Sequence, residues 1–367
     1  MPLKGRIDLR SDTFTEPTSA MRQAMATCDV GDDVWDLDPT VHELQKFAAE
    51  TFGKESALFV PSSVMANLIA VMAHTTGRGE EILVGDRCHI SLYEQGNVST
   101  IGGVHVRTIK NFDDGTLDLE ELKLKIRPLN NVHFPRTSSV CIESSHNMCS
   151  GSALPLEFIE SVSKICKENS IPLHMDGARV FNSATALGID VAKYTAAADS
   201  VTVCLSKGLA APIGSLLIGA TSFIAKAKQL RKALGGGMRQ AGVIACCGLM
   251  ALKDMTQRLH EDHANAKSLY RHLSQVPGVI IQEPQTNIVK FSLSKDHLGE
   301  VSLGGLVKHL ESKKVFLITV DEGRSIRAVT HYHITAADIE QAASAIKSAL
   351  EEVGLGSLNL AEQQRVY

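Results

Sequence analysis

The 367-residue sequence lacks the features that mark several large classes of protein. Its formal net charge is only −4 and it contains no basic stripe, which argues against a nucleic acid as its partner. No apolar run approaches the roughly 18 residues that a membrane-spanning helix needs. The first residues contain no apolar signal core, so we expect a cytoplasmic protein with neither a membrane nor a nucleic acid as its partner.

The eight cysteines form no C-x-x-C pair, and most of them lie in apolar surroundings. In a chain of this length without an export signal, they are predicted to be reduced and mostly buried. No cluster of cysteine, histidine and carboxylate residues has the spacing of a zinc site, so no metal is predicted. An apolar content of 44% and a charged content of 21% are typical of a globular protein with a well-buried core.

Short apolar runs alternate with helical patterns up to about residue 255. The segment "PTVHELQKFAAETFG" has Asp38 as its N-cap, Pro39 at its first position and Gly53 at its end, which predicts a helix. Runs such as "SALFV", "EILVGD" and "IPLHMDGA" predict buried strands. This alternation favours an α/β fold with a parallel sheet, which places ligands at the carboxyl ends of the strands.

The pattern changes near residue 255, and we predict a large domain over residues 1–255 and a smaller α+β domain over residues 256–367. The second segment contains a long helical stretch, several short strands and a closing helix. Thr335 and Asp338 approach a capping box at the start of that closing helix.

The stretch "DSVTVCLSKGLAAPIGSLLIGA" contains one lysine, Lys207, between an apolar strand and a loop rich in small residues. Desolvation lowers the pKa of a buried lysine and makes its amine nucleophilic, as a Schiff-base lysine requires. Asp176 ends an earlier predicted strand and Arg179 follows it. Pyridoxal 5′-phosphate needs a lysine for its aldehyde and an acid for its pyridine nitrogen, so this combination indicates that cofactor.

Seven sequence blocks occur in a characteristic order between Ile7 and about Thr330. They are "IDLRSDTFTEPTSAM", "GDD…DPTVHELQ", "FGKESALFVPS", "CHISLYEQG", "HMDGARVFNSA", "SKGLAAPIGS" and "GGGMRQAG". With these blocks the chain resembles the low-specificity L-threonine aldolases, which are pyridoxal-phosphate enzymes of fold type I. The resemblance implies a large domain on a mainly parallel seven-stranded sheet, a smaller C-terminal α+β domain, and pyridoxal 5′-phosphate as the cofactor.

The resemblance also implies a role for each site residue. Lys207 and Asp176 would hold the cofactor, and His89 and His133 would lie near the substrate hydroxyl as further catalytic residues. The implied cofactor-binding residues are Lys207, Asp176, Arg179, His89, Ser62, Ser63, Val64, Ser206 and Arg239. The implied substrate-binding residues are Ser11, Arg179, Arg327, Trp35, Tyr93 and Lys232.

The implied reaction is a retro-aldol cleavage of the Cα–Cβ bond of L-threonine, L-allo-threonine or a related β-hydroxy amino acid. It releases glycine and an aldehyde, which is acetaldehyde from threonine, and requires no metal. Sites of this family usually form between subunits, so the resemblance implies a homo-oligomer, either a dimer or a homotetramer built as a dimer of dimers.

The sequence departs from the family pattern around this site. The phosphate turn, usually Ser/Thr-Gly-Thr-x-x-Asn, reads "SSVMAN", so Ser63 and Val64 replace the glycine and the threonine. Further replacements are Trp35 for a tyrosine, Asp36 and Leu37 for a glycine and an acid, Ser144 and Ser145 for Asn-Thr, and Ala210 for a glycine. We interpret these changes as a working cofactor site with a remodelled pocket. An amino-acid racemase, a β-eliminating lyase and a pseudoenzyme remain the alternatives.

Overall fold

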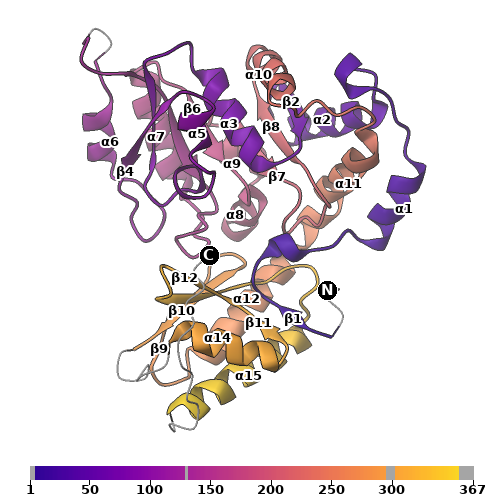
Figure 1. The fold of residues 1–367 in the computed structure, drawn as a ribbon, viewed down its shortest axis with the longest axis vertical. Helices are drawn as coiled ribbons and strands as arrows, with labels where there is room; N and C mark the ends of the chain where they lie inside the picture. The colour runs from indigo at the N-terminus through magenta and orange to yellow at the C-terminus, as the bar shows by residue number, and fades with distance from the viewer. Residues whose placement is uncertain (1–4, 129–130, 295–301, 355–367) are drawn as a thin grey trace. The chain divides into compact units, whose positions relative to one another are not determined.

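The computed structural model describes residues 5–128, 131–294 and 302–354, which form two compact units (Figure 1). The large unit is Glu16–Gln257, and the small unit joins Met1–Thr15 to Arg258–Tyr367. No helix in the described part of the chain is long and apolar enough to cross a membrane. Each unit is described by itself below.

The large unit is built on a seven-stranded sheet in the order β2-β8-β7-β6-β5-β3-β4. β8 runs antiparallel to both of its neighbours, and the remaining pairs are parallel. This arrangement confirms the predicted mainly parallel seven-stranded sheet. The strands are β2 (Ser56–Val60), β3 (Glu80–Gly85), β4 (His105–Ile109), β5 (Arg136–Glu143), β6 (Leu173–Asp176), β7 (Ser200–Cys204) and β8 (Ser215–Gly219).

Helices connect and cover these strands. They are α1 (Ser19–Thr27), α2 (Pro39–Thr51), α3 (Ser63–His74), α4 (His89–Leu92), α5 (Asn97–Thr100), α6 (Leu119–Lys125), α7 (Leu156–Glu168), α8 (Val180–Leu187), α9 (Val191–Thr195), α10 (Thr221–Ala233) and α11 (Gly242–Lys253), with the 3-10 turn η2 (Asp33–Trp35). The α2 prediction is confirmed, because the Asp38 side chain accepts hydrogen bonds from the backbone N–H groups of Thr40 and Val41. α3 and α10 pack together, and Leu58 and Val60 of β2 belong to their buried cluster.

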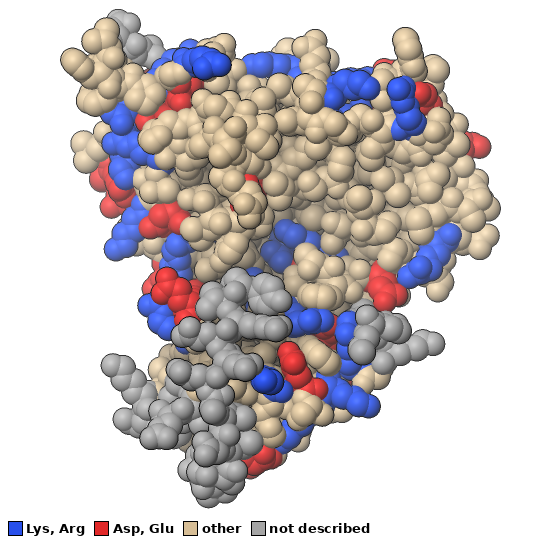
Figure 2. Space-filling model, in the orientation of Figure 1, with Lys and Arg blue, Asp and Glu red and all other residues tan. Residues whose placement is uncertain are grey.

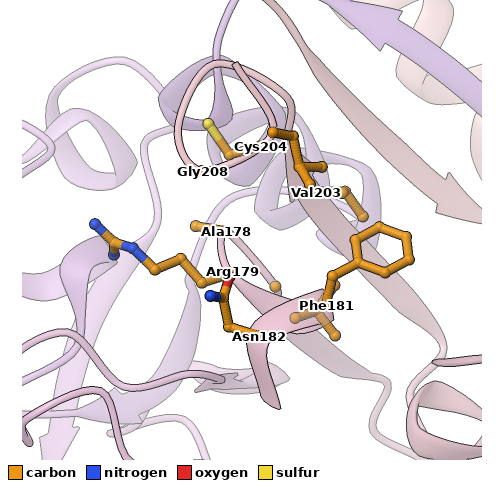
Figure 3. A pocket seen from close by; sticks show the side chains of 10 residues that line it. Ala178, Arg179, Phe181, Asn182, Val203, Cys204 and Gly208 are labelled. Atoms are coloured by element: carbon orange, nitrogen blue, oxygen red, sulfur yellow. The ribbon is translucent and has the colours of Figure 1, made fainter. Parts of the chain in front are cut away.

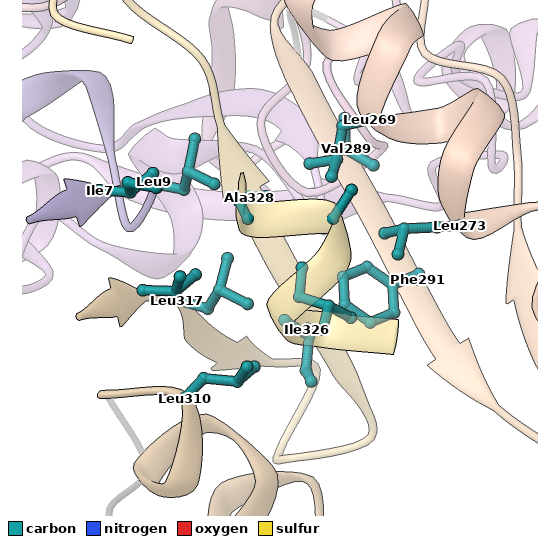
Figure 4. Packing of buried hydrophobic residues seen from close by; sticks show 14 of the residues in the cluster. Ile7, Leu9, Leu269, Leu273, Val289, Phe291, Leu310, Leu317, Ile326 and Ala328 are labelled. Carbon is teal, nitrogen blue, oxygen red and sulfur yellow. The ribbon is translucent and has the colours of Figure 1, made fainter. Parts of the chain in front are cut away.

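The small unit contains a four-stranded antiparallel sheet in the order β12-β13-β10-β9. Its apolar core, which Figure 4 shows from close by, includes Leu269 of α12, Phe291 of β10 and Leu310 of α14. The elements are η1 (Asp12–Phe14), α12 (Leu259–Leu273), β9 (Val279–Ile281), β10 (Ile288–Leu293), α14 (Leu303–Ser312), β11 (Val315–Phe316), β12 (Ile318–Val320), β13 (Ser325–Val329) and α15 (Ala336–Gly354), and η3 (Met255–Arg258) lies at the unit boundary.

The N-terminal segment is grouped differently from our expectation. We assigned this segment to the large domain of residues 1–255, whereas the structure groups its described residues, 5–15, with the small unit. β1 (Ile7–Asp8) pairs in parallel with β11, and Ile7 lies opposite Val315. Ile7 and Leu9 are buried in the core of the small unit, so burial of apolar surface holds the segment there.

Candidate active site

Two adjacent strands of the large unit bring the predicted cofactor lysine and its partner acid to one edge of the sheet. β6 and β7 are parallel, and Asp176, the last residue of β6, lies opposite Thr202 of β7. Lys207 follows Cys204, the last residue of β7, by three positions. The short helices α8 and α9 connect the two strands. Because parallel strands end at the same edge, Asp176 and Lys207 emerge together.

The loop after β7 turns tightly around Lys207, which is half-buried. The Lys207 carbonyl oxygen accepts a hydrogen bond from the backbone N–H of Ala210, with an N–O distance of 2.9 Å. Ala210 is fully buried and has a φ of 60°, in the left-handed region that glycine adopts most easily. The alanine therefore keeps the turn at a cost of about 1–2 kcal/mol.

A small pocket lies beside this loop, between the turn after β6 and the turn after β7 (Figure 3). Figure 3 shows Phe181 on one side of it and the side chain of Arg179 extending the opposite way. Ser206, predicted to bind the cofactor, has its Oγ 3.5 Å from Sγ of Cys204. The pocket is lined by Gly177, Ala178, Arg179, Val180, Phe181, Asn182, Val203, Cys204, Gly208 and Leu209.

His89 begins α4 and contacts a buried carboxylate. Its Nδ1 is 3.0 Å from Oε1 of Glu94, and its backbone N–H donates to Oε2 of Glu143 at 2.6 Å. Burial lowers the pKa of His89, but the hydrogen bond to Glu94 and the charge of Asp176 outweigh it, so the pKa is raised. The positive charge of Lys207 opposes this rise in the pKa of His89.

Three buried residues to which the sequence assigned no role complete this arrangement. Asn67 donates from Nδ2 to Oδ2 of Asp176 at 2.9 Å and to Oε1 of Glu94 at 2.8 Å. Glu94 is 2% exposed, and its burial raises its pKa against the opposing hydrogen bond from His89. Glu143, the third, holds the backbone of His89. Glu94 lies within one of the family-like blocks and Asn67 is the last residue of the phosphate turn "SSVMAN", but neither carries a chemical signature of its own.

The turn predicted to hold the cofactor phosphate forms the start of α3. Ser62 caps the helix by accepting a hydrogen bond from the backbone N–H of Met65 at 3.2 Å. The Oγ atoms of Ser63 and Ser215 are 3.1 Å apart. The backbone N–H groups of Ser63 and Val64 lie in the first turn of this 12-residue helix, where they can bind an anion. They offer a phosphate site that does not need the missing threonine hydroxyl.

Tyr93 and Ser144 lie near the site in different ways. The Tyr93 ring centroid is 5.6 Å from that of His89, and its hydroxyl donates to Sδ of Met148 at 3.2 Å. The Ser144 hydroxyl is buried instead, with Oγ 2.6 Å from the Tyr194 hydroxyl. Because Oγ of Ser183 lies 2.9 Å from Oγ of Ser144, Ser144 belongs to a structural group of three hydroxyls.

The segment around η2 carries the other predicted pocket residues. Trp35 is 73% exposed in the single chain. Arg239 pairs with Asp32, with an N–O distance of 3.0 Å. Lys232 lies on the exposed side of α10. The roles predicted for Trp35, Arg239 and Lys232 at the cofactor or substrate remain predictions.

His133 lies on an exposed loop, where its backbone N–H donates to Oδ1 of Asn131 at 3.0 Å. Among residues 5–128, 131–294 and 302–354, no hydrogen bond, ion pair or ring contact joins its side chain to Lys207, Asp176 or His89. Its expected place near the substrate hydroxyl remains a prediction.

Ser11 and Arg327 belong to the small unit, and the structure brings their segments together. The Ser11 hydroxyl caps η1 and accepts a hydrogen bond from the backbone N–H of Thr13 at 3.2 Å. Arg327, on β13, donates from Nη2 to the carbonyl oxygen of Arg10, the residue before Ser11, at 3.3 Å. That Ser11 and Arg327 bind the substrate carboxylate remains a prediction.

Among the residues that the structure describes, two groups of side chains have the close spacing of a metal site. In the first, Cys88, Glu143 and His146 are all buried, and the candidate ligand atoms lie within 4.8 Å of one another. Burial raises the pKa of the Cys88 thiol well above its usual value, which disfavours the thiolate that a metal would need. The second group is the arrangement of His89, Glu94 and Asp176 described above. We assign no metal to either.

The residues at this sheet edge fit pyridoxal 5′-phosphate. Lys207 would supply the amine for its aldehyde, and buried Asp176 would supply the carboxylate for its ring nitrogen. The start of α3 offers N–H groups for its phosphate. Thr202, opposite Asp176, has a buried hydroxyl without a hydrogen-bond partner, as expected beside a group bound over this edge.

The family model described as beta-eliminating lyase matches residues 8–296. Low-specificity L-threonine aldolase 1 of Arabidopsis thaliana is 45% identical over 345 residues, covering 94% of this chain and 96% of that one. The low specificity L-threonine aldolase of Escherichia coli K12 is 39% identical over 338 residues, covering 92% and 97%. The structure of Leishmania major threonine aldolase shares the fold, with a TM-score of 0.79, 19% identity, and 94% and 99% coverage.

Fold, site and family model together define a pyridoxal-phosphate-dependent lyase of fold type I. Within that class, the chain belongs to the family of low-specificity L-threonine aldolases.

Proposed function

We propose that the protein cleaves the Cα–Cβ bond of L-threonine, L-allo-threonine or a related β-hydroxy amino acid, releasing glycine and an aldehyde. The observation that carries this proposal is the placement of Lys207, Asp176 and His89 at one sheet edge. It is supported by an identity of 45% to the Arabidopsis aldolase over almost the whole chain.

Lys207 and Asp176 would bind two different groups of the cofactor, its aldehyde and its ring nitrogen. The amine of Lys207 would hold the cofactor through its aldehyde. Asp176, from its buried position, would pair with the ring nitrogen and keep it protonated. When bound, pyridoxal 5′-phosphate accepts the electron pair released from the broken Cα–Cβ bond.

His89 accepts the proton of the substrate hydroxyl. The Glu94 carboxylate occupies its Nδ1 side, so Nε2 is the atom available to the substrate. The raised pKa of His89 favours a proton taken up there. His133 would assist at the same hydroxyl, and Arg179, Ser11 and Arg327 would bind the substrate carboxylate.

The pocket around the substrate side chain is remodelled by Trp35. Trp35 and the nearby Leu37 are 73% and 67% exposed, and neighbouring exposed apolar side chains mark interaction surfaces, so a partner subunit would cover them in a site shared between subunits. Figure 2 shows a broad area of the large unit with few charged side chains, which supports a homo-oligomer, dimer or tetramer. Sedimentation of the purified protein tests this, and a monomer at micromolar concentration would contradict it.

We place the protein in the cytoplasm, because seven of its eight free cysteines are buried thiols of the kind retained in reducing compartments.

The first experiment measures acetaldehyde and glycine released from L-threonine and L-allo-threonine by protein supplied with pyridoxal phosphate, with absorption spectra from the same sample. Both products, together with a cofactor band, would establish the aldolase. A cofactor band without acetaldehyde would favour a racemase or a β-eliminating lyase. Absence of both would indicate a pseudoenzyme.

A matched pair of lysine variants tests the assignment of the covalent residue. Lys207→Ala is expected to abolish turnover and the cofactor adduct that borohydride reduction traps, because no other amine occupies its place at the end of β7. Lys123→Ala, at an exposed position on α6, is the control and is expected to retain both. Full turnover by Lys207→Ala would refute the assignment.

A further inference from the structure

The amide of Asn67 is the junction of a buried polar network in the large unit. One nitrogen, Nδ2, lies 2.9 Å from Oδ2 of Asp176 and 2.8 Å from Oε1 of Glu94. Asn67 is fully buried, and each of the two acids is 2% exposed. Two carboxylates therefore share one amide donor in a place with little access to water.

The direction of this network follows from its donors and acceptors. Carboxylate oxygens accept, so Asn67 presents Nδ2 to the acids and Oδ1 to Nε2 of His174, 3.2 Å away. Nε2 of His174 must carry the hydrogen, and its Nδ1 then accepts from the Ser200 hydroxyl at 2.8 Å. Burial lowers the pKa of His174 to about 4, which keeps this ring neutral at pH 7.

The network continues beyond Ser200 in the same sense. The Ser200 hydroxyl donates to His174, so its oxygen accepts from Nε2 of His74 at 2.7 Å. Burial lowers the pKa of His74 to about 3, so this imidazole is also a neutral donor. Every donor from His74 onward is directed toward Asp176 and Glu94. The chain of bonds thus supports negative charge at those two acids.

The opposite end of the network reaches His89. Oε1 of Glu94, the atom bonded to Asn67, also lies 3.0 Å from Nδ1 of His89. Asp176, Glu94 and His89 are thereby connected through one amide. Any change in the orientation of that amide alters the environment of both the ring-nitrogen partner and the imidazole.

We propose that Asn67 is a positioning residue that couples Asp176 to the Glu94–His89 pair, and that His174 holds the Asn67 amide in the orientation this coupling requires. The proposal rests on the proposed function only for the roles of Asp176 and His89. A flipped amide would present its oxygen to two carboxylates, which is unfavourable, and the hydrogen bond from His174 prevents it.

The test follows the titration of His89 by NMR in the apoprotein, with His89→Gln used to assign the signal. The charged groups that face the imidazole are Glu94 from its own turn, Asp176 from β6 and Lys207 after β7, while Glu143 of β5 bonds its backbone. Asn67→Leu removes a donor from two anions. We expect the midpoint of the His89 titration to rise by at least about 1 pH unit.

Asn111→Leu is the matched control. Asn111 is 4% exposed, and its side chain bonds to the backbone groups of Gly115 and Arg87. The substitution removes a buried amide of the same size, so it is expected to cost stability without moving the His89 midpoint. An equal shift in both variants would reduce Asn67 to a packing role and overturn the proposal.

Two variants test the role of His174. The first removes its hydrogen bond to Asn67, and the second restores a donor at the same place. His174→Phe removes the donor to Oδ1 of Asn67 and is expected to raise the same midpoint, together with an increase of about tenfold in the dissociation constant of pyridoxal phosphate. His174→Gln returns an N–H group near the position of Nε2 and is expected to restore both values. An unchanged midpoint in folded Asn67→Leu and His174→Phe would overturn the proposal.

The apoprotein titration separates this proposal from the proposed function. A shifted midpoint without any aldolase activity in the wild-type protein would support the coupling and refute the reaction. An unshifted midpoint in a protein that releases acetaldehyde would support the reaction and refute the coupling.

Discussion

A buried ion pair beneath the turn that carries Trp35 allows a quantitative prediction. Nη2 of Arg231, on α10, lies 2.7 Å from Oδ2 of Asp33 on η2, and the two side chains are only 3% and 2% exposed. Nη1 of Arg231 also donates to the carbonyl oxygen of Phe59 at 2.7 Å. Arg231→Met removes both interactions, fills a similar volume and leaves the Asp33 carboxylate buried.

The expected loss is about 3–5 kcal/mol of unfolding free energy at neutral pH, the range measured when one partner of a buried pair is removed. Asp33→Asn in the Arg231→Met background removes the stranded charge and is expected to recover part of this loss. The recovered part of the unfolding free energy measures the cost of the unpaired Asp33 carboxylate. The part that is not recovered measures the loss of the hydrogen bond to Phe59.

The pH dependence has a definite sign. Burial raises the pKa of Asp33, and Arg231 opposes that rise, so Arg231→Met raises the pKa further. A carboxyl whose folded-state pKa lies above its unfolded-state pKa contributes stability at low pH that is lost as the pH rises. The deficit of Arg231→Met relative to wild type is therefore largest near pH 7.5 and smaller near pH 5.5.

Urea unfolding at these two pH values measures the deficit. The sequence contains a single tryptophan, Trp35, two positions from Asp33, and its fluorescence reports on this turn while circular dichroism follows the whole chain. A deficit below about 1 kcal/mol, or the same deficit at both pH values, would refute the reasoning.

Two further predictions concern other parts of the fold. Burial raises the pKa of Asp262 to about 7 despite Arg258 beside it, so its stabilising contribution is lost as the pH rises through 7. Asp262→Asn is expected to flatten the fall in melting temperature between pH 6 and pH 8, measured by calorimetry, and an unchanged slope would contradict this. Gly214 has a φ of 114°, and an added Cβ would lie 2.5 Å from the Phe59 ring. Gly214→Ala is expected to cost more than about 2 kcal/mol in urea unfolding, whereas a cost below about 0.5 kcal/mol would show that the loop adapts.

Local signals in the sequence were sufficient for many of the elements. The Asp38 cap and Pro39 mark the start of α2, and Gly53 follows its end with a φ of 59°. Thr335 and Asp338 exchange hydrogen bonds at the start of α15, as the capping-box pattern predicts. These features depend on residues within a few positions of one another, which the sequence displays directly.

Features that depend on distant residues were missed. β1 and β11 pair across most of the chain, and the apolar run "VFLITV" divides at Leu317 into β11 and β12, which belong to different sheets. Asn67, Glu94 and Asp176 come from α3, the turn after α4 and β6, so only the folded chain brings them together. The resemblance supplied Asp176 and Lys207 because their motifs are distinctive, whereas Asn67, although it ends the phosphate turn, gives no sign in the sequence of the two acids that it joins.

The pairing of Ile7 with Val315 also bears on the synthesis of the protein. These partners are 308 positions apart, so a ribosome adding about 5–20 residues per second needs roughly 15–60 s between them. The large unit, from Glu16 to Gln257, is contiguous and leaves the ribosome complete before β11 exists. Throughout that interval the core of the small unit is incomplete, so Ile7 and Leu9 stay exposed until the C-terminal part of the chain has been synthesised.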